Sequence, residues 1–455
     1  MVDQPNIILI NCDDLGYGDL GCYGSGVNKT PAIDGLAADG LRFTSFYMAS
    51  PVCSPSRGAL LTGCYPPRIG FGEFEGLPVL FPGQPLGLPP TEVSIAKVLS
   101  DAGYRTQMVG KWHCGDQPEF LPTNHGFDNY FGLPYSNDMG PQVGDHPVHR
   151  YPPLPLLLDD DVIEQQPEQS SLTTRYVNEA VRFMRSSRDQ PFFLYLAHLY
   201  VHLPIYALPQ FLEKSTNGTY GAAVESIDWA TAVLLNELDR LGLTDDTVVV
   251  FTSDNGSLGT NGGSNGTLRG NKGSTWEGGM RVPGIVRWPG RIPAGSTTSV
   301  LATAMDLLPT LAGIGGASLP TDRTIDGRDI SSIWFDPTSG SPHEVFAYYW
   351  MNDLEAIRDH RWKLHFSKHG DPDPALYDLD TDPSETSDVL AEHPEVAARL
   401  QAHADTIRAS LGDSRTSTVG SDIRPVGHVD EPSTLTRYDP RHPYYIAEYD
   451  LADRG

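Results

Sequence analysis

Four apolar runs of strand length, separated by segments with helical periodicity, are the feature that most limits how this chain can fold. The runs lie at residues 6–11, 106–110, 191–197 and 247–253, and the expected helices lie at residues 91–102, 172–186 and 221–241. Gly103 and Gly242 directly follow two of these helices, as is common where a helix ends. This alternation is typical of a sheet covered by helices, so the sequence predicts an α/β fold with a mostly parallel sheet.

The pattern changes after about residue 342. Short strand-like runs follow one another at residues 345–350, 355–358, 362–366 and 375–378, and a helical segment lies at residues 394–410. Such an order indicates a small antiparallel sheet with one covering helix. We therefore expect a large domain at residues 1–341, a smaller α+β domain at residues 342–413, and a tail at residues 414–455. The tail is expected to pack on the surface or on a neighbouring subunit of a homo-oligomer.

Composition excludes several classes of function. The 455 residues carry a formal net charge of -26, which disfavours nucleic-acid binding and means that an anionic substrate would need locally clustered cations. The five cysteines lack zinc spacing and are too few for a disulfide framework. The sequence contains no apolar run that would span a bilayer and no signal-peptide pattern before the first strand. We expect no membrane partner and a cytoplasmic location, or a periplasmic or secreted one if a signal has been removed.

Acidic and amide side chains follow the first and the fourth apolar runs. Asp13 and Asp14 come after the first run, and Asp254 and Asn255 come directly after the fourth. Ligands of open parallel sheets gather beyond the carboxyl ends of the strands, so we expect these four side chains to converge. Either pair alone would suggest a turn or a helix cap, but both together indicate a site for a hard divalent cation such as Ca²⁺ or Mg²⁺.

Basic side chains follow the other two runs. Lys111 and His113 come after the second run, and His202 comes a few residues after the third. Basic side chains that face a metal site are explained by an anion bound between the metal and these side chains. The basic side chains would neutralise the charge of the anion, and a histidine could transfer protons. His198 lies closer to the end of the third run and is expected to be structural.

A Gly-rich segment at residues 256–273 follows the Asp254 strand and carries Lys272. Such a loop lets a cation approach a bound substrate closely. Glu277 and Arg281, just beyond it, are expected to brace the loop rather than to react. The Pro- and Gly-rich segments at residues 76–90 and 133–155 are predicted to be loops around the site.

Cys53 opens the most specific motif of the chain. Cys, Pro and Arg stand at alternate positions 53, 55 and 57, and Ala-Leu-Leu-Thr-Gly follows at residues 59–63 in a helix-like segment. A helix N-terminus and a nearby cation would by themselves favour a reactive thiolate. The full pattern, however, resembles the signature of the type I sulfatases, in which this cysteine is oxidised to formylglycine after translation.

Further motifs extend this resemblance from Asn6 to about Asp380, most closely to the arylsulfatase A and N-acetylgalactosamine-6-sulfatase branch. It implies an alkaline-phosphatase-like sheet and a sulfatase catalytic domain at residues 1–341. It also implies one calcium ion and a formylglycine made from Cys53 by a formylglycine-generating enzyme. The implied metal ligands are Asp13, Asp14, Asp254, Asn255 and residue 53. The other implied site residues are Arg57, Lys111, His113, Ser136, His202 and Lys272.

The resemblance also implies a mechanism and a role for each of these residues. A hydroxyl of the formylglycine hydrate would attack the sulfur of a small aryl or sugar sulfate, giving a covalent sulfo-enzyme. Arg57 and Lys111 would hold the hydrate and the sulfate, and His113 would be the base that releases sulfate. His202 and Lys272 would contact the sulfate and protonate the leaving oxygen, near Ser136.

Three other functions stay open from the sequence. The same scaffold could hydrolyse phosphate or phosphonate esters beside its metal. A non-enzymatic sulfate-ester binding protein would keep Cys53 as a thiol, and a papain-like thiol hydrolase would leave the acidic strand ends unexplained. The acidic composition favours small sulfate esters over long sulfated polymers.

Overall fold

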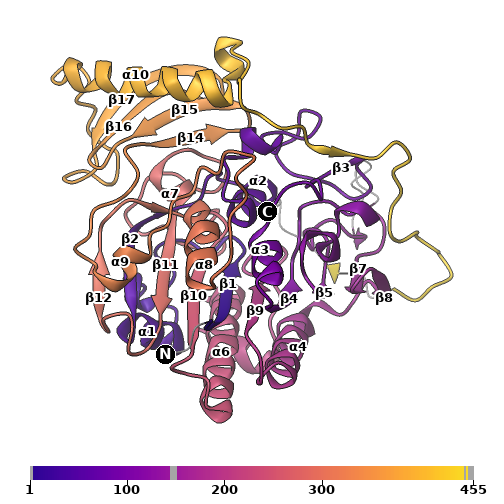
Figure 1. The fold of residues 1–455 in the computed structure, drawn as a ribbon. Coiled ribbons are helices and arrows are strands. Elements are labelled where there is room, and N and C mark those ends of the chain that lie inside the picture. The colour runs from indigo at the N-terminus through magenta and orange to yellow at the C-terminus, as the bar shows by residue number, and fades with distance from the viewer. Residues whose placement is uncertain (1–3, 144–150, 445–446, 449–455) are drawn as a thin grey trace.

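The computed structural model describes residues 4–143, 151–444 and 447–448, and within them an 11-stranded sheet lies between two layers of helices (Figure 1). In sheet order its strands are β12 (Ser296–Thr298), β2 (Leu41–Tyr47), β11 (Arg281–Arg287), β10 (Thr247–Ser253), β1 (Asn6–Cys12), β9 (Phe192–Ala197), β4 (Arg105–Gly110), β5 (Asn129–Gly132), β7 (Pro155–Leu158) and β8 (Asp161–Gln165), with β13 (Ala302–Thr303) also paired to β2. The strands from β10 to β5 are parallel, and antiparallel pairs lie on either side. The α/β prediction is therefore confirmed.

Alternate residues of the central strand β1 face the two helix layers. Ile7 and Leu9 belong to one apolar core, and Ile8 and Ile10 belong to the other. The first core contains the helices α2 (Cys53–Thr62), α3 (Ile95–Asp101) and α8 (Leu307–Ile314), and the second contains α1 (Pro31–Ala38), α4 (Leu172–Ser186) and α6 (Gly218–Leu241). Burial of β1 on both faces explains why its sequence is continuously apolar.

A second sheet lies above one edge of the first (Figure 1). Its four antiparallel strands are β14 (Phe346–Trp350), β15 (Asp353–Arg358), β16 (Trp362–Lys368) and β17 (Asp371–Asp378), and it is covered by α10 (Pro394–Leu411). Tyr47 of β2 packs against Phe346 and Tyr348 of β14, with ring centroids 5.4 and 6.1 Å apart. The two sheets therefore share a core, which also includes Leu400 and Ala404 of α10.

The tail after α10 crosses the surface of the large sheet's loops (Figure 1). Strand β18 (Gly427–His428) pairs with β3 (Leu86–Gly87), and β19 (Ala447–Glu448) pairs with β6 (Gln142–Val143). The remaining short helices are α5 (Pro209–Leu212), α7 (Glu277–Met280) and α9 (Ser331–Phe335), with 3₁₀ turns at Gly21–Tyr23, Pro66–Ile69, Pro118–Phe120, Pro122–His125, Gln169–Ser171, Ala304–Asp306 and Ser414–Thr416.

Several predicted boundaries were wrong by a few residues. Helix α3 begins at Ile95 rather than at residue 91, because the Ser94 hydroxyl accepts the Lys97 amide and caps the helix there. Helix α6 begins three residues before Gly221, and β17 begins at Asp371 rather than at residue 375. The segments at residues 76–90 and 133–155, predicted to be loops, contain the short strands β3 and β6, and residues 144–150 lie outside the described part of the chain.

Candidate active site

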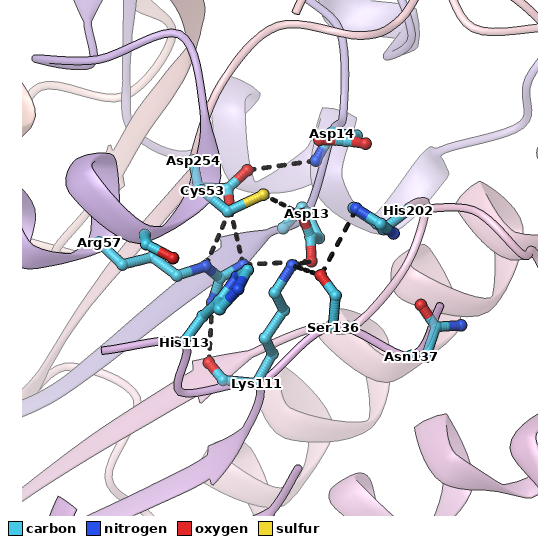
Figure 2. A network of polar contacts seen from close by, with 12 residues as sticks. Asp13, Asp14, Cys53, Arg57, Lys111, His113, Ser136, Asn137, His202 and Asp254 are labelled. Atoms are coloured by element: carbon cyan, nitrogen blue, oxygen red, sulfur yellow. Dashed lines mark hydrogen bonds and ion pairs between the residues drawn. The ribbon is translucent and has the colours of Figure 1, made fainter. Parts of the chain in front are cut away.

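The carboxyl ends of β10, β1, β9 and β4 lie level with one another. Cys12 of β1 pairs with Ser253 of β10, and Ala197 of β9 pairs with both Asn11 and Gly110. The residues that follow these positions therefore enter one space at the edge of the sheet (Figure 2). They are Asp13 and Asp14 after β1, Lys111 and His113 after β4, His202 after β9, and Asp254 and Asn255 after β10.

Helix α2 begins at Cys53 and brings this residue to the same space. The Cys53 Sγ lies 3.4 Å from Asp13 Oδ1, and the residue is 1% exposed. Burial and the neighbouring Asp13 carboxylate raise the pKa of the Cys53 thiol well above its usual range, although Lys111 and Lys272 oppose the shift. An unmodified Cys53 is therefore held as a neutral thiol, which does not favour the thiolate nucleophile of a cysteine hydrolase.

Arg57 lies one helical turn after Cys53 and is completely buried. Its Nε and Nη2 contact Asp254 Oδ2 at 2.9 and 2.8 Å, and Nη2 lies 3.5 Å from Asp13 Oδ2. Its Nη1 donates to the Lys111 carbonyl at 2.8 Å. The guanidinium therefore connects the ends of three strands and provides a fixed positive charge behind the cysteine.

Lys111 joins the acidic and the histidine sides of the site. Its Nζ lies 2.5 Å from Asp13 Oδ2 and donates to Ser136 Oγ at 2.5 Å. Ser136 Oγ in turn lies 3.5 Å from His202 Nε2. Since His202 Nδ1 donates to the Leu203 carbonyl at 2.5 Å, its Nε2 carries the free lone pair that faces Ser136.

His113 adopts a left-handed backbone conformation with φ of 62°. Its Nε2 donates to the Leu80 carbonyl at 3.0 Å, and Nδ1 has no hydrogen-bond partner among the described residues. Burial and the Lys111 charge lower the His113 pKa well below its usual value, so its Nδ1 is a neutral acceptor. Burial, Lys272 and Lys111 likewise lower the pKa of His202.

Lys272 reaches the site from the Gly-rich loop. Its Nζ lies 2.9 Å from both Asp14 oxygens, and its side chain is 6% exposed. Its backbone N–H donates to the Ser257 carbonyl, and the next amide, of Gly273, donates to the Pro51 carbonyl. The loop is thus held against the segment that leads into α2, and the Lys272 charge is held in the site.

The acidic side of the site can hold a cation. Ligand atoms of Asp13, Asp14, Cys53 and Asp254 all lie within 4.8 Å of one another. Asn255 Nδ2 donates to Asp14 at 2.7 Å, and its buried Oδ1 has no hydrogen-bond partner in the described part of the chain. Burial and the Asp13 charge raise the pKa of Asp254 to about 7. Like charges this close are relieved by a bound cation, and the oxygen donors suit calcium or magnesium.

Ten of the eleven residues proposed from the sequence are joined by the contacts described here, and His113 lies beside them in Figure 2. His198, expected to be structural, is buried with neither ring nitrogen hydrogen-bonded to a described residue, and burial lowers its pKa to about 3. Glu277, expected to brace the loop, accepts hydrogen bonds from Tyr47 and Tyr348 at 2.5 and 2.8 Å.

Two groups at the site were not predicted from the sequence. The Leu80 carbonyl orients His113, but a backbone acceptor in a distant loop leaves no sequence signal. Asp138 is half-buried, and burial raises its pKa to about 6 although the charges of Lys111 and Lys272 oppose this shift. It stands two residues after Ser136, so the same short block could have suggested it.

Comparisons with known proteins agree with this arrangement. Residues 5–317 match the sulfatase family, and residues 271–410 match the C-terminal region of N-sulphoglucosamine sulphohydrolase. The chain is 36% identical to steryl-sulfatase of Rattus norvegicus, covering 90% of this chain and 90% of the relative. It is 41% identical to arylsulfatase A of Homo sapiens (87% and 86% covered) and 41% identical to N-acetylgalactosamine-6-sulfatase of Rattus norvegicus (79% and 71%).

A solved structure named Ps i-CgsB superposes with a TM-score of 0.79 at 30% identity, covering 92% of this chain and 95% of that chain. The fold and the site thus define a hydrolase with an alkaline-phosphatase-like sheet. The chain belongs to the sulfatase family, and it is a sulfuric ester hydrolase. The resemblance inferred from the Cys53 motif is confirmed. Within the described ranges, no helix combines the length and the apolar character needed to cross a bilayer.

Proposed function

We propose that this enzyme hydrolyses a small sulfate monoester to an alcohol or phenol and inorganic sulfate through a formylglycine derived from Cys53. The observation that carries the proposal is the position of Cys53 between buried cations and buried acids. Sγ contacts Asp13, while Arg57, Lys111 and Lys272 supply positive charge around it. A sulfate ester resists nucleophiles until its oxygens are neutralised, and buried cations neutralise it without reorganising at the moment of reaction.

The formylglycine hydrate would supply a nucleophilic hydroxyl that forms a covalent sulfo-enzyme, and a second hydroxyl whose deprotonation expels sulfate. Its maturation requires a formylglycine-generating enzyme as partner. The raised pKa of the Cys53 thiol supports this modification, because an unmodified thiol is poorly activated here. Asp13, Asp14, Asp254 and Asn255 would hold one calcium ion, which would add positive charge on the acidic side of the site.

The neighbouring side chains have separate roles in this proposal. Arg57 and Lys111 hold the nucleophile and the sulfate oxygens. His113 is the base, since its Nδ1 is a free acceptor fixed by the bond from Nε2 to the Leu80 carbonyl.

Lys272 and His202 contact the sulfate and protonate the leaving oxygen. The negative charge of a bound sulfate monoester offsets the lysine charges that help to lower the His202 pKa, so binding favours protonation of its Nε2. Ser136, between Lys111 and His202, keeps both side chains directed at the anion.

The test begins with protein produced together with a formylglycine-generating enzyme. Its intact mass should be about 18 Da below the mass calculated from the unmodified sequence. This protein should cleave an aryl sulfate much faster than the matching aryl phosphate, and the Cys53→Ala variant should cleave neither. Removal of metal with a chelator should abolish turnover, and calcium should restore it. A fully matured preparation that leaves aryl sulfates, sulfated monosaccharides and choline sulfate intact would refute the proposal.

A further inference from the structure

A buried cluster of four charged side chains and one threonine connects the Lys272 loop to the C-terminal sheet. Five residues form this cluster, called the clamp below: Thr275 and Glu277 from the loop side, Glu355 and Lys363 from the second sheet, and Glu385 from the segment after β17. Every one of them is buried. The clamp begins only three residues after Lys272, so it bears directly on where that side chain can lie.

Lys363 is the centre of the clamp. Its Nζ donates to the Thr275 carbonyl at 2.8 Å and lies 3.0 Å from Glu277 Oε1 and 2.9 Å from Glu385 Oε1. One ammonium group on β16 therefore uses its three donors on three acceptors, two of which belong to the loop that continues from Lys272.

Two glutamates of the C-terminal part hold the loop at further points. Glu385 Oε2 accepts the Glu277 amide at 2.7 Å, and Glu355 Oε2 accepts the Thr275 hydroxyl at 2.7 Å. The Trp276 ring lies between two cations, with the Arg269 guanidinium 3.7 Å and the Lys368 ammonium 4.0 Å from its centroid. Each residue from 275 to 277 is thus fixed by a contact to the C-terminal part or to a neighbouring cation.

The charge of Glu277 in the clamp is balanced by buried cations. Burial alone would raise the pKa of Glu277, but Lys363, Arg358 and Arg281 outweigh it and keep this carboxylate ionised. A buried ion pair adds little stability compared with apolar residues of the same size, whereas its geometry is specific. Stability alone therefore does not explain a charged cluster at this position.

The loop is also held at Lys272 itself and at Gly273. The Lys272 amide bonds to Ser257 at 3.0 Å, and the Gly273 amide bonds to Pro51, two residues before Cys53, at 2.9 Å. The anchor to the cysteine segment at Gly273 and the clamp at residues 275–277 thus both follow Lys272 directly in the chain.

We propose that Lys363, Glu355 and Glu385 are positioning residues that hold Lys272 in place for turnover, so that the C-terminal sheet completes the active site. This inference rests on the proposed function. A displacement of a catalytic group by about 1 Å can cost a hundredfold in rate. A small shift of Lys272 after loss of the clamp would therefore be enough to lower kcat.

The test compares three variants of the full-length, formylglycine-bearing enzyme. Lys363→Met removes the central charge. Thr275→Val removes the hydroxyl that donates to Glu355 and accepts from Lys368 Nζ at 3.3 Å, and leaves Lys363 in place. Arg408→Met is the control, because Arg408 forms a buried ion pair with Asp413 at 2.7 Å in the same C-terminal part and makes no contact with the Lys272 loop in the described structure. Each variant is measured by kcat and KM on an aryl sulfate, by hydrogen exchange of the Lys272 and Gly273 amides, and by melting temperature.

Lys363→Met should lower kcat by about tenfold to a hundredfold, with a smaller change in KM, and should speed exchange at Lys272 and Gly273. Thr275→Val should act in the same direction by a few-fold. Arg408→Met should lower the melting temperature and leave kcat, KM and this exchange unchanged.

Folded Lys363→Met and Thr275→Val variants with wild-type kinetics and wild-type exchange would overturn the inference. A mature wild-type enzyme that cleaves no sulfate ester, while the Lys363→Met variant still exchanges faster at Lys272, would instead refute the proposed function and confirm the anchoring of the loop.

Discussion

Cys53 offers the sharpest test at the scale of one residue. In the Cys53→Ser variant a single hydroxyl can attack the sulfate ester, but the second hydroxyl needed to expel sulfate is missing. We expect substrate binding to persist and turnover to stop after at most one equivalent of alcohol is released. Single-turnover and steady-state kinetics on an aryl sulfate measure the two steps separately. Steady-state rates close to those of the wild type would contradict the proposed chemistry.

Ser136 is a second residue-scale test, because its hydroxyl lies between Lys111 Nζ and His202 Nε2. The Ser136→Ala variant leaves both side chains without this partner, and a hydrogen bond to a charged group contributes about 1.5–3 kcal/mol. We expect kcat/KM on an aryl sulfate to fall by about tenfold to a hundredfold. Ser226→Ala is the matched control, since Ser226 is also buried but bonds to Ala222 within α6. Equal activities in the two variants would remove Ser136 from the site.

The site residues differ in how far the sequence could predict them. Asp13, Lys111 and Asp254 follow buried parallel strands, and such strand ends converge whatever the details of the fold. Leu80 and Lys363 could not be predicted, because their effect depends on contacts with His113 and Thr275 across 33 and 88 residues of chain. No local pattern marks a carbonyl or a buried lysine as a partner of a distant loop.

At the scale of elements, the start of α1 depends on a side chain from another helix. Thr30 occupies the N-cap without a side-chain capping bond, and Asp228 Oδ1 of α6 instead accepts the Ala32 and Ile33 amides, both at 2.9 Å. The Asp228→Ala variant leaves these two donors unpaired and should destabilise the protein by about 1–2 kcal/mol. Asp228→Asn retains an acceptor oxygen and should lose less. Chemical denaturation measures both, and identical midpoints for Ala and Asn would exclude this capping role.

The Asp228 carboxyl group should also make the free energy of unfolding depend on pH. Burial raises the pKa of Asp228 from 3.8 to about 6, so the folded state holds this proton more tightly than the unfolded state does. Its contribution to stability is therefore complete below pH 3.8 and is lost as the pH rises through about 6. The melting temperature of Asp228→Asn relative to the wild type should thus rise between about pH 4 and about pH 7. A constant difference over this range would contradict the raised pKa.

Element boundaries show where periodicity stops being informative. Residues 91–94 continue the helical pattern before α3, but the Ser94 hydroxyl caps the Lys97 amide and the helix starts at Ile95. Strand β17 extends back to Asp371 because its first residues pair with β16, although they are exposed and include two prolines.

The domain boundary at residue 341 stays a prediction. It falls in the segment between α9 and β14, where the described chain passes from one sheet to the other.

At the scale of the whole molecule, the tail fastens loops that surround the site. Residues 424–436, called the strap, begin with Arg424, whose Nε and Nη2 contact Glu92 at 2.5 and 3.0 Å. Further along, Ser433 exchanges two hydrogen bonds with Gln117, at 2.9 and 3.0 Å. Between these points β18 pairs with β3, in the loop segment that also carries the Leu80 carbonyl. The strap therefore pairs with the segment that also carries the Leu80 carbonyl, the acceptor that orients His113.

This arrangement predicts that a chain ending at Ile423 will fold but turn over slowly. The parallel strands and the cores on both faces of the large sheet are formed mainly by residues before the strap, whereas β3 would lose its only strand partner in the described structure. A shift of the Leu80 carbonyl would misplace His113 Nδ1. We therefore expect kcat on an aryl sulfate to fall by about tenfold or more.

A chain ending at Tyr438 is the matched control, because it loses the end of the tail but keeps every strap contact described above. It should retain wild-type kcat, and both chains should show the circular dichroism of a folded α/β protein. If the chain ending at Ile423 turns over as fast as the one ending at Tyr438, the strap does not support the base. If both are equally slow, the residues after 438 carry the effect instead.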